Sequence, residues 1–159
     1  MFRDMKREKQ LITENETIEV IKRNENGILS VIGDGGYPYG VPVNYSYDGD
    51  KIYFHCAKDG HKIDAITKDD KVCFTIVDVD EVIPEEFNTY YRSAIVFGRA
   101  HVISDVEEMK NALRVIVDKF SPDFKEKAES YIEAETDTVC VVAIDIEHIS
   151  GKQAEPLFG

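Results

Sequence analysis

The chain has 159 residues, enough for one domain with a sizeable core, and its 43% hydrophobic and 31% charged residues are typical of a folded globular protein. Its formal net charge of -12 argues against nucleic acid and anionic membranes as partners, because both would repel it. No apolar run approaches the ~20 residues that span a bilayer, and residues 1–10 lack the apolar centre of a signal peptide. We therefore expect a cytoplasmic protein.

The three cysteines, Cys56, Cys73 and Cys140, all fall in predicted strands. Their odd number and the absence of a C-x-x-C pair argue against a disulfide framework or a zinc site. Free cysteine is among the most buried residue types, so we expect reduced thiols that pack as small hydrophobes. No histidine spacing indicates a metal site.

The N-terminal third predicts an arm, a helix and two strands. Residues 1–12 are charged and form a flexible arm, and Thr13 with Glu16 makes a capping box that begins a helix. Asn26-Gly27 is expected to end this helix. Strands follow at 28–32 and 39–47, joined by a glycine-rich turn. Because Pro42 removes a ladder donor, the second strand is either an edge strand or one whose backbone faces a planar ligand.

The stretch 52–62 has the strongest functional signal. Residues 52–56 alternate as a strand, a short polar loop follows, and helical spacing begins after Gly60. A loop that leads into a helix N-terminus makes an anion site, and Lys58, His61 and Lys62 supply positive charge there. The alternative is an ordinary strand-to-helix connection with solvated lysines.

The C-terminal half continues with strands and two helices. Strands are expected at 72–77, 90–104 and 138–146, with Gly98 at a bulge or bend and an acidic loop at 78–88. Ser104 and Glu107 predict a second capping box, for a helix that runs to about Phe120, and a further helix covers about 124–135. Without regular βαβ alternation, the pattern favours a mainly β fold: a six-stranded, mostly antiparallel small barrel with peripheral helices.

Five phrases of the sequence occur in an order that resembles a known family. They are Tyr37-Pro38-Tyr39-Gly40-Val41-Pro42-Val43, Ile52-Tyr53-Phe54-His55, Gly60-His61-Lys62, Tyr91-Arg92-Ser93-Ala94-Ile95-Val96-Phe97-Gly98 and His148-Ile149-Ser150-Gly151-Lys152. Together they resemble the pyridoxamine 5′-phosphate oxidase-like FMN-binding split barrels, and among them the Nim-type nitroimidazole-resistance proteins. The resemblance implies a domain over 13–152, with a C-terminal tail at 153–159.

The resemblance also implies a homodimer of split β-barrels that holds FMN between its subunits. The implied cofactor contacts are Gly40, Val41, Pro42, Val43 and Asn44 at the ring edge; His55, Cys56, Ala57 and Lys58 along the ribityl chain and phosphate; Gly60, His61 and Lys62 at the phosphate; and Tyr91, Arg92 and Ser93 from the facing strand, contributed by the partner subunit. His55 corresponds to the active-site histidine of the Nim-type proteins, and we expect it to donate a proton or contact substrate. A packed core histidine is the alternative for His55.

Two departures argue against a true pyridoxamine phosphate oxidase. The oxidases proper have arginine and lysine where this chain has Tyr39 and Asn44, and their C-terminal region is longer. We therefore expect an FMN-dependent oxidoreductase that passes electrons from a reduced nicotinamide or another donor to a small oxidised substrate, with nitro-aromatic compounds as a candidate class. The alternatives are a non-catalytic flavin-binding or storage module, or a split barrel that uses deazaflavin or haem.

Overall fold

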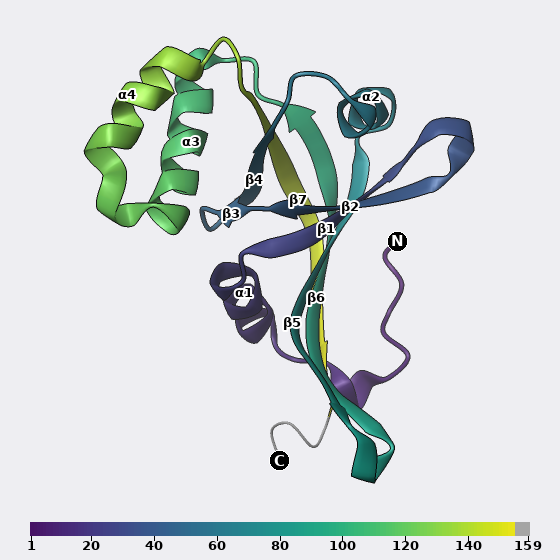
Figure 1. The fold of residues 1–159 in the computed structure, drawn as a ribbon. Helices are drawn as coiled ribbons and strands as arrows, with labels where there is room; N and C mark the ends of the chain where they lie inside the picture. Colours follow the sequence, from purple (N-terminus) through teal and green to yellow (C-terminus); the bar gives the residue numbers. More distant parts are fainter. Residues whose placement is uncertain (155–159) are drawn as a thin grey trace.

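In the computed structural model, which describes residues 1–154, seven strands form one antiparallel sheet in the order β2-β1-β5-β6-β7-β4-β3 (Figure 1). The strands are β1 (Asn26–Ile32), β2 (Pro38–Asn44), β3 (Ser46–Tyr47), β4 (Lys51–Cys56), β5 (Lys71–Ile83), β6 (Asn88–Val102) and β7 (Cys140–Gln153). The sheet therefore confirms the predicted mainly β, antiparallel split barrel. Of the predicted tail 153–159, residues 155–159 lie outside the described part of the chain.

The sheet closes on itself because the strand predicted at 39–47 changes partner at Tyr45. Its first part, β2, pairs with β1, and its second part, β3, pairs with β4. Tyr45 is fully buried; its hydroxyl donates to the carbonyl of Ile21 at 2.5 Å and its N–H donates to the carbonyl of Glu25 at 3.1 Å. These bonds fix the bend, so six predicted strands become seven in the structure.

The core fills the inside of the barrel. Strand parity sends Leu29, Phe54, Phe74, Val96 and Ile144 inward, where each is fully buried. A second, smaller cluster joins Tyr53, Ile103, Met109, Ile116 and Val141 beneath the longest helix. Burial of this apolar surface is the main force that holds the strands in register.

Residues 1–154 form four helices outside the barrel: α1 (Glu14–Arg23), α2 (His61–Lys68), α3 (Val106–Phe120) and α4 (Lys125–Glu135), with short 3₁₀ turns at Glu8–Gln10, Asp34–Gly36, Pro84–Glu86 and Pro122–Phe124. The predicted capping box of Thr13 and Glu16 begins α1. The second predicted box is wrong by one residue: Asp105 caps α3, and its carboxylate accepts from the N–H of Glu108 at 2.8 Å.

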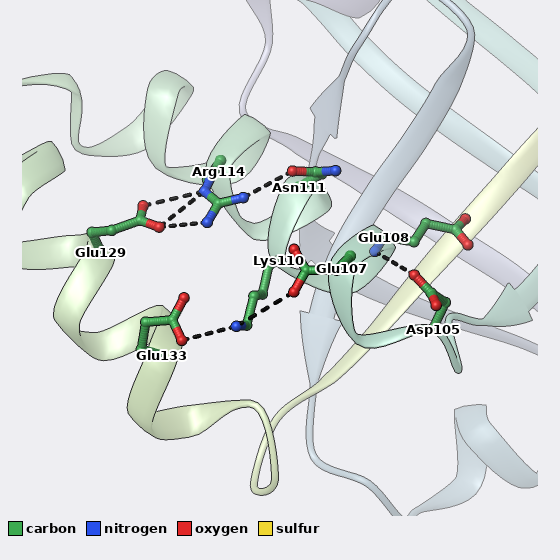
Figure 2. A network of polar contacts seen from close by, with 8 residues as sticks. All are labelled: Asp105, Glu107, Glu108, Lys110, Asn111, Arg114, Glu129 and Glu133. Atoms are coloured by element: carbon green, nitrogen blue, oxygen red, sulfur yellow. Dashed lines mark hydrogen bonds and ion pairs between the residues drawn. The ribbon is translucent and has the colours of Figure 1, made fainter.

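Ion pairs join α3 to α4 on the outside of the molecule (Figure 2). Lys110 lies 2.8 Å from Glu133, and Arg114 lies 2.5 Å from Glu129. Three of these four side chains are 37–56% exposed and that of Lys110 is 13% exposed, so each pair still has an open partner and contributes little to stability. Figure 1 shows this helix pair at the end of the barrel away from the β5–β6 hairpin, with α2 on the other side of β4 and β7.

Two other boundary predictions are wrong. The acidic stretch 78–88 is not a loop: β5 and β6 remain paired out to Ile83 and Asn88, after a bulge between Val77 and Val79. Helix α1 ends at Arg23, before Asn26-Gly27, which belong to β1. Gly27 is needed there for packing, because a Cβ at this position would lie 2.2 Å from the ring of Phe74.

The predicted bulge at Gly98 is confirmed. The register of β6 against β7 shifts between Phe97 and Gly98, and a Cβ at Gly98 would lie 2.2 Å from the carbonyl oxygen of Asp145. The N-terminal arm lies along β6 and β7, where Phe2 stacks on His148 with ring centroids 4.8 Å apart. No helix formed by residues 1–154 has the length and apolar character needed to cross a membrane.

Candidate functional site

Strand β2 is the last strand on one side of the sheet, and β1 is its single neighbour within the described chain. Its side chains alternate: Tyr39, Val41 and Val43 pack against the core, whereas Gly40, Pro42 and Asn44 are exposed. Proline tolerates this ladder only where its nitrogen faces away from the neighbouring strand. Gly40 and Asn44 lie two positions away on either side, so their backbone N–H and C=O groups also point away from β1. Pro42 thus marks an edge strand, one of the two predicted alternatives.

On the side of β4 that faces away from β7, the ladder ends before His55. The β3–β4 ladder stops at Ser46 opposite Tyr53. An unbroken ladder would place Asn44 opposite His55, but the bend at Tyr45 carries β2 to β1 instead. His55 is exposed, while Phe54 beside it is fully buried. The alternative of a packed core histidine is therefore wrong.

Helix α2 begins without a side-chain cap. Gly60, at its N-cap, has φ 130° and open space around the position of a Cβ. The first helical bond runs from the N–H of Asp64 to the carbonyl of Gly60 at 3.0 Å. Within residues 1–154, the N–H groups of His61, Lys62 and Ile63 have no hydrogen-bond partner. Three free donors at the positive end of a helix favour an anion.

The three cations predicted for this corner have different surroundings. Lys58 donates from its ammonium to the carbonyl of Asp137, which holds the loop against the segment before β7. His61 accepts at Nε2 from the N–H of Asp34 at 3.2 Å, so its Nδ1 carries the proton and is a donor. The Lys62 ammonium makes no hydrogen bond or ion pair with the residues that the structure describes. Lys62 is thus the cation most available to a ligand.

The imidazole of His61 also brings α2 to β2. It stacks on the ring of Tyr39, with centroids 4.1 Å apart and planes at 24°. The structure therefore brings together two of the predicted segments, 40–44 and 55–62. Sequence reasoning missed Tyr39, Asp34 and Asp137 as parts of this corner; the Gly33–Gly36 turn was the one local signal for Asp34.

Cys56 and Ala57 lie between β4 and the loop. Burial raises the pKa of the Cys56 thiol to about 11; Cys140 adds to this rise and the charge of Lys62 opposes it. Cys56 is therefore a protonated thiol at neutral pH and a poor nucleophile.

Tyr91, Arg92 and Ser93 lie near the start of the long strand β6, where the ladder pairs Ser93 with Val77 of β5 and with Lys152 of β7. The Tyr91 hydroxyl donates to Gln10 at 2.5 Å. Arg92 pairs with Asp78 at 2.5 Å, and Ser93 lines a cavity beneath the arm. Within one chain, β1 and β5 lie between β2 and the strand that carries this third predicted segment, and β7 lies between that strand and β4.

Comparison with known proteins decides the family. A family model described as pyridoxamine 5′-phosphate oxidase matches residues 13–153. The chain belongs to the pyridoxamine 5′-phosphate oxidase family. This confirms the resemblance found in the sequence. No curated protein sequence matches the chain.

Solved structures show the same fold at low sequence identity. A candidate 5-nitroimidazole antibiotic resistance protein from Bacteroides thetaiotaomicron VPI-5482 is 23% identical, with a TM-score of 0.74 over 90% of this chain and 86% of that one. The flavocytochrome Anf3 from Azotobacter vinelandii is 22% identical, with a TM-score of 0.82 over 96% and 72%. An FAD and haem binding protein from Mycobacterium smegmatis is 21% identical, with a TM-score of 0.80 over 93% and 74%. Split barrels of this shape thus include proteins named for flavin or haem.

Proposed function

We propose that this protein is an FMN-binding oxidoreductase that works as a homodimer, with the flavin phosphate held at the start of α2. The observation that carries the proposal is the N-terminus of α2, which has no side-chain cap and three N–H groups without a partner among residues 1–154, and which carries Lys62 in its first turn. In a molecule with a formal net charge of -12, such a corner is the natural place for a dianionic ester.

The neighbouring edge of β2 suits the flat ring system of a flavin. The outward backbone groups of Gly40 and Asn44 supply donors and acceptors, and Pro42 leaves one position without a donor. Gly40 also has no side chain to keep a ring away from the backbone. FMN fits this combination of a polar strand edge and an anion site; FAD, with its longer diphosphate tail, is the alternative that the names of structural neighbours raise.

A homodimer is supported by the outer face of the sheet. Two rows of residues run straight across five strands and are made up of Pro42, Ile28, Thr75, Ile95 and Ser150, and of Gly40, Ser30, Cys73, Phe97 and His148. None of these ten residues is Asp or Glu, although the chain contains 31 Asp and Glu residues. Two copies of a strongly acidic protein can approach through such a face without like-charge repulsion between residues of the face itself. The face reaches the β2 edge at Gly40 and Pro42, so a partner seated there would also border the flavin.

A partner subunit would also explain why one chain leaves its third segment apart. We propose that Tyr91, Arg92 and Ser93 complete the site from the second subunit. The Phe2 ring packs on His148 and Phe97, with centroids 4.8 Å and 5.4 Å away, so the arm covers part of the same face.

A bound flavin supplies two-electron redox chemistry, and the protein supplies orientation and protons. His55 is exposed next to the diverging strand edges, where it can contact a substrate and deliver a proton. Pyridoxamine phosphate is a poor candidate substrate: the Tyr39 ring is stacked on His61, and the Asn44 amide is bonded to Asn26 at 3.2 Å, so neither supplies a cation for its phosphate. We propose a small oxidised acceptor instead, of the nitro-aromatic class.

The absorption spectrum of the purified full chain tests this proposal, with mass identification of the compound released on denaturation. We expect an oxidised-flavin spectrum and FMN, either as purified or after addition of FMN. Released FAD would correct the cofactor, and a Soret band would indicate haem. A colourless protein that refuses added flavin would refute the proposal. Reduction by NADH or NADPH and reoxidation by a nitro-aromatic compound then separate an oxidoreductase from a storage module, which would hold FMN but turn over slowly with every donor.

A further inference from the structure

Cys56 and Cys140 are directly opposite each other at the end of the β4–β7 ladder. Opposed residues in an antiparallel pair point to the same face, with Cα atoms about 4.5 or 5.5 Å apart. Disulfides join Cα atoms that are about 4.4–6.8 Å apart. The register therefore brings these two thiols within bonding range while the barrel is folded.

The packing around the two cysteines agrees with the register. Cys140 is buried in the main core cluster, and Cys56, which is half-buried, packs against that cluster. Both are free thiols. On the same pair of segments, Lys58 already holds the loop after Cys56 against Asp137, just before Cys140. A bond between the two sulfurs would add to an existing contact and move little of the backbone.

We propose that Cys56 and Cys140 form a dithiol that a two-electron oxidant of the peroxide class closes to an intrachain disulfide in the folded protein. The Cys56 sulfur, as the more exposed of the two, attacks the O–O bond, takes one oxygen as a sulfenic acid and releases water. The Cys140 sulfur then displaces that hydroxyl as a second water. The two thiols lose two protons and two electrons in all, and the peroxide is reduced to two waters.

Closure of this dithiol needs no flavin, although Cys56 lies in the segment proposed to contact FMN. In reducing compartments such disulfides are transient and serve catalysis or redox sensing. Burial holds the pKa of Cys56 at about 11, so the thiolate is scarce and closure is slow at neutral pH. The pair therefore stays reduced unless peroxide is abundant, and it opens again when dithiothreitol is added.

The test treats the full chain with hydrogen peroxide at mildly alkaline pH, blocks remaining thiols with iodoacetamide and maps the peptides by mass spectrometry. We expect one disulfide between Cys56 and Cys140, with Cys73 on β5 alkylated as the internal control. The oxidised protein should melt roughly 5–15 °C higher than the reduced protein, because the bond closes a long loop. Dithiothreitol should reverse this shift.

Single substitutions Cys56→Ser and Cys140→Ser should each abolish the disulfide and the shift, whereas Cys73→Ser should leave both unchanged. Peroxide products in which Cys56 and Cys140 are over-oxidised separately, or joined to Cys73 or to another chain, would overturn the proposal. So would an oxidised protein that melts below the reduced one, since its bond would not fit the folded geometry.

Discussion

Tyr39 on β2 stacks on His61, the first residue of α2, with ring centroids 4.1 Å apart. This contact connects the strand edge proposed for the flavin ring to the helix end proposed for the phosphate. It also holds His61 with Nε2 on the N–H of Asp34, which leaves Nδ1–H as the donor. The two halves of the proposed site therefore depend on one aromatic pair.

Replacement of Tyr39 should loosen the anion site. In Tyr39→Ala, His61 loses a stacking partner that contributes about 0.5–1.5 kcal/mol, so FMN affinity should fall roughly 2–13-fold. Tyr39→Phe keeps the stacked ring and serves as the matched control, with affinity unchanged in a fluorescence titration. Equal loss in both variants would mean that the hydroxyl, and not the stack, supports binding.

His55 should affect turnover and not cofactor retention. In His55→Ala the exposed imidazole is lost without a change in the core, so FMN should remain bound and the melting temperature should stay the same. Reoxidation of the reduced protein by a nitro-aromatic acceptor, followed by stopped-flow absorbance, should slow by about 100-fold or more if His55 delivers the proton. His101→Ala, on β6, which β7 separates from β4, is the control; if the two variants reoxidise alike, His55 is not the proton donor.

Asp78 should make stability depend on acid pH. Burial alone would raise the pKa of this carboxyl, but hydrogen bonds from Arg23, Asn24 and Arg92 outweigh burial and hold its pKa well below the usual value. As pH falls, this carboxyl is protonated in the unfolded chain before it is protonated in the folded one. The stabilisation of the fold by Asp78 is therefore complete above about pH 4 and is lost as pH falls further.

Asp78→Asn should lower the free energy of unfolding by about 1–3 kcal/mol at pH 7, since both arginine partners remain partly solvated. Urea unfolding measured from pH 7 to pH 3 should also show a shallower decline for this variant than for the wild type. Asp123→Asn, at an exposed position, should match the wild type throughout. An Asp78→Asn curve parallel to that of the wild type would contradict the assignment.

The outer sheet face predicts the effect of a new charge on assembly. Ile95→Glu puts a carboxylate in the middle of the uncharged rows, so it should shift the protein from dimer to monomer in sedimentation and lower FMN affinity in parallel. Val106→Glu adds the same charge at an exposed position on α3, away from this face, and should change neither. A wild-type monomer that binds FMN fully would refute the proposed dimer.

Strand parity and capping chemistry were sufficient to predict much of this fold. Alternation along residues 52–56 correctly separated His55 from Ile52 and Phe54, and the capping box at Thr13 fixed the start of α1. The strand-to-helix switch at Gly60 likewise located the uncapped end of α2. Each of these signals is local, so neighbouring residues were enough to read it.

The features that the sequence could not predict depend on distant partners. The bend at Tyr45 is set by bonds to Ile21 and Glu25, far back in the chain, and Lys119 on α3 donates to the Tyr45 carbonyl at 2.9 Å. The acidic composition of 78–88 is typical of a loop, but residues 79–83 extend β5 because they pair with residues 88–92 of β6. The stacking of Tyr39 on His61 needs the same folded context.

The most direct test of the central claim is a comparison of FMN with riboflavin, which lacks the phosphate. Equilibrium titrations of the apoprotein should show that FMN binds more tightly, and that Lys62→Ala weakens FMN by about 1.5–3 kcal/mol while riboflavin affinity stays the same. Lys68→Ala, at the other end of α2, should leave both ligands unaffected. Equal affinity for FMN and riboflavin in the wild type, or an unchanged FMN affinity in Lys62→Ala, would show that the start of α2 does not hold the phosphate.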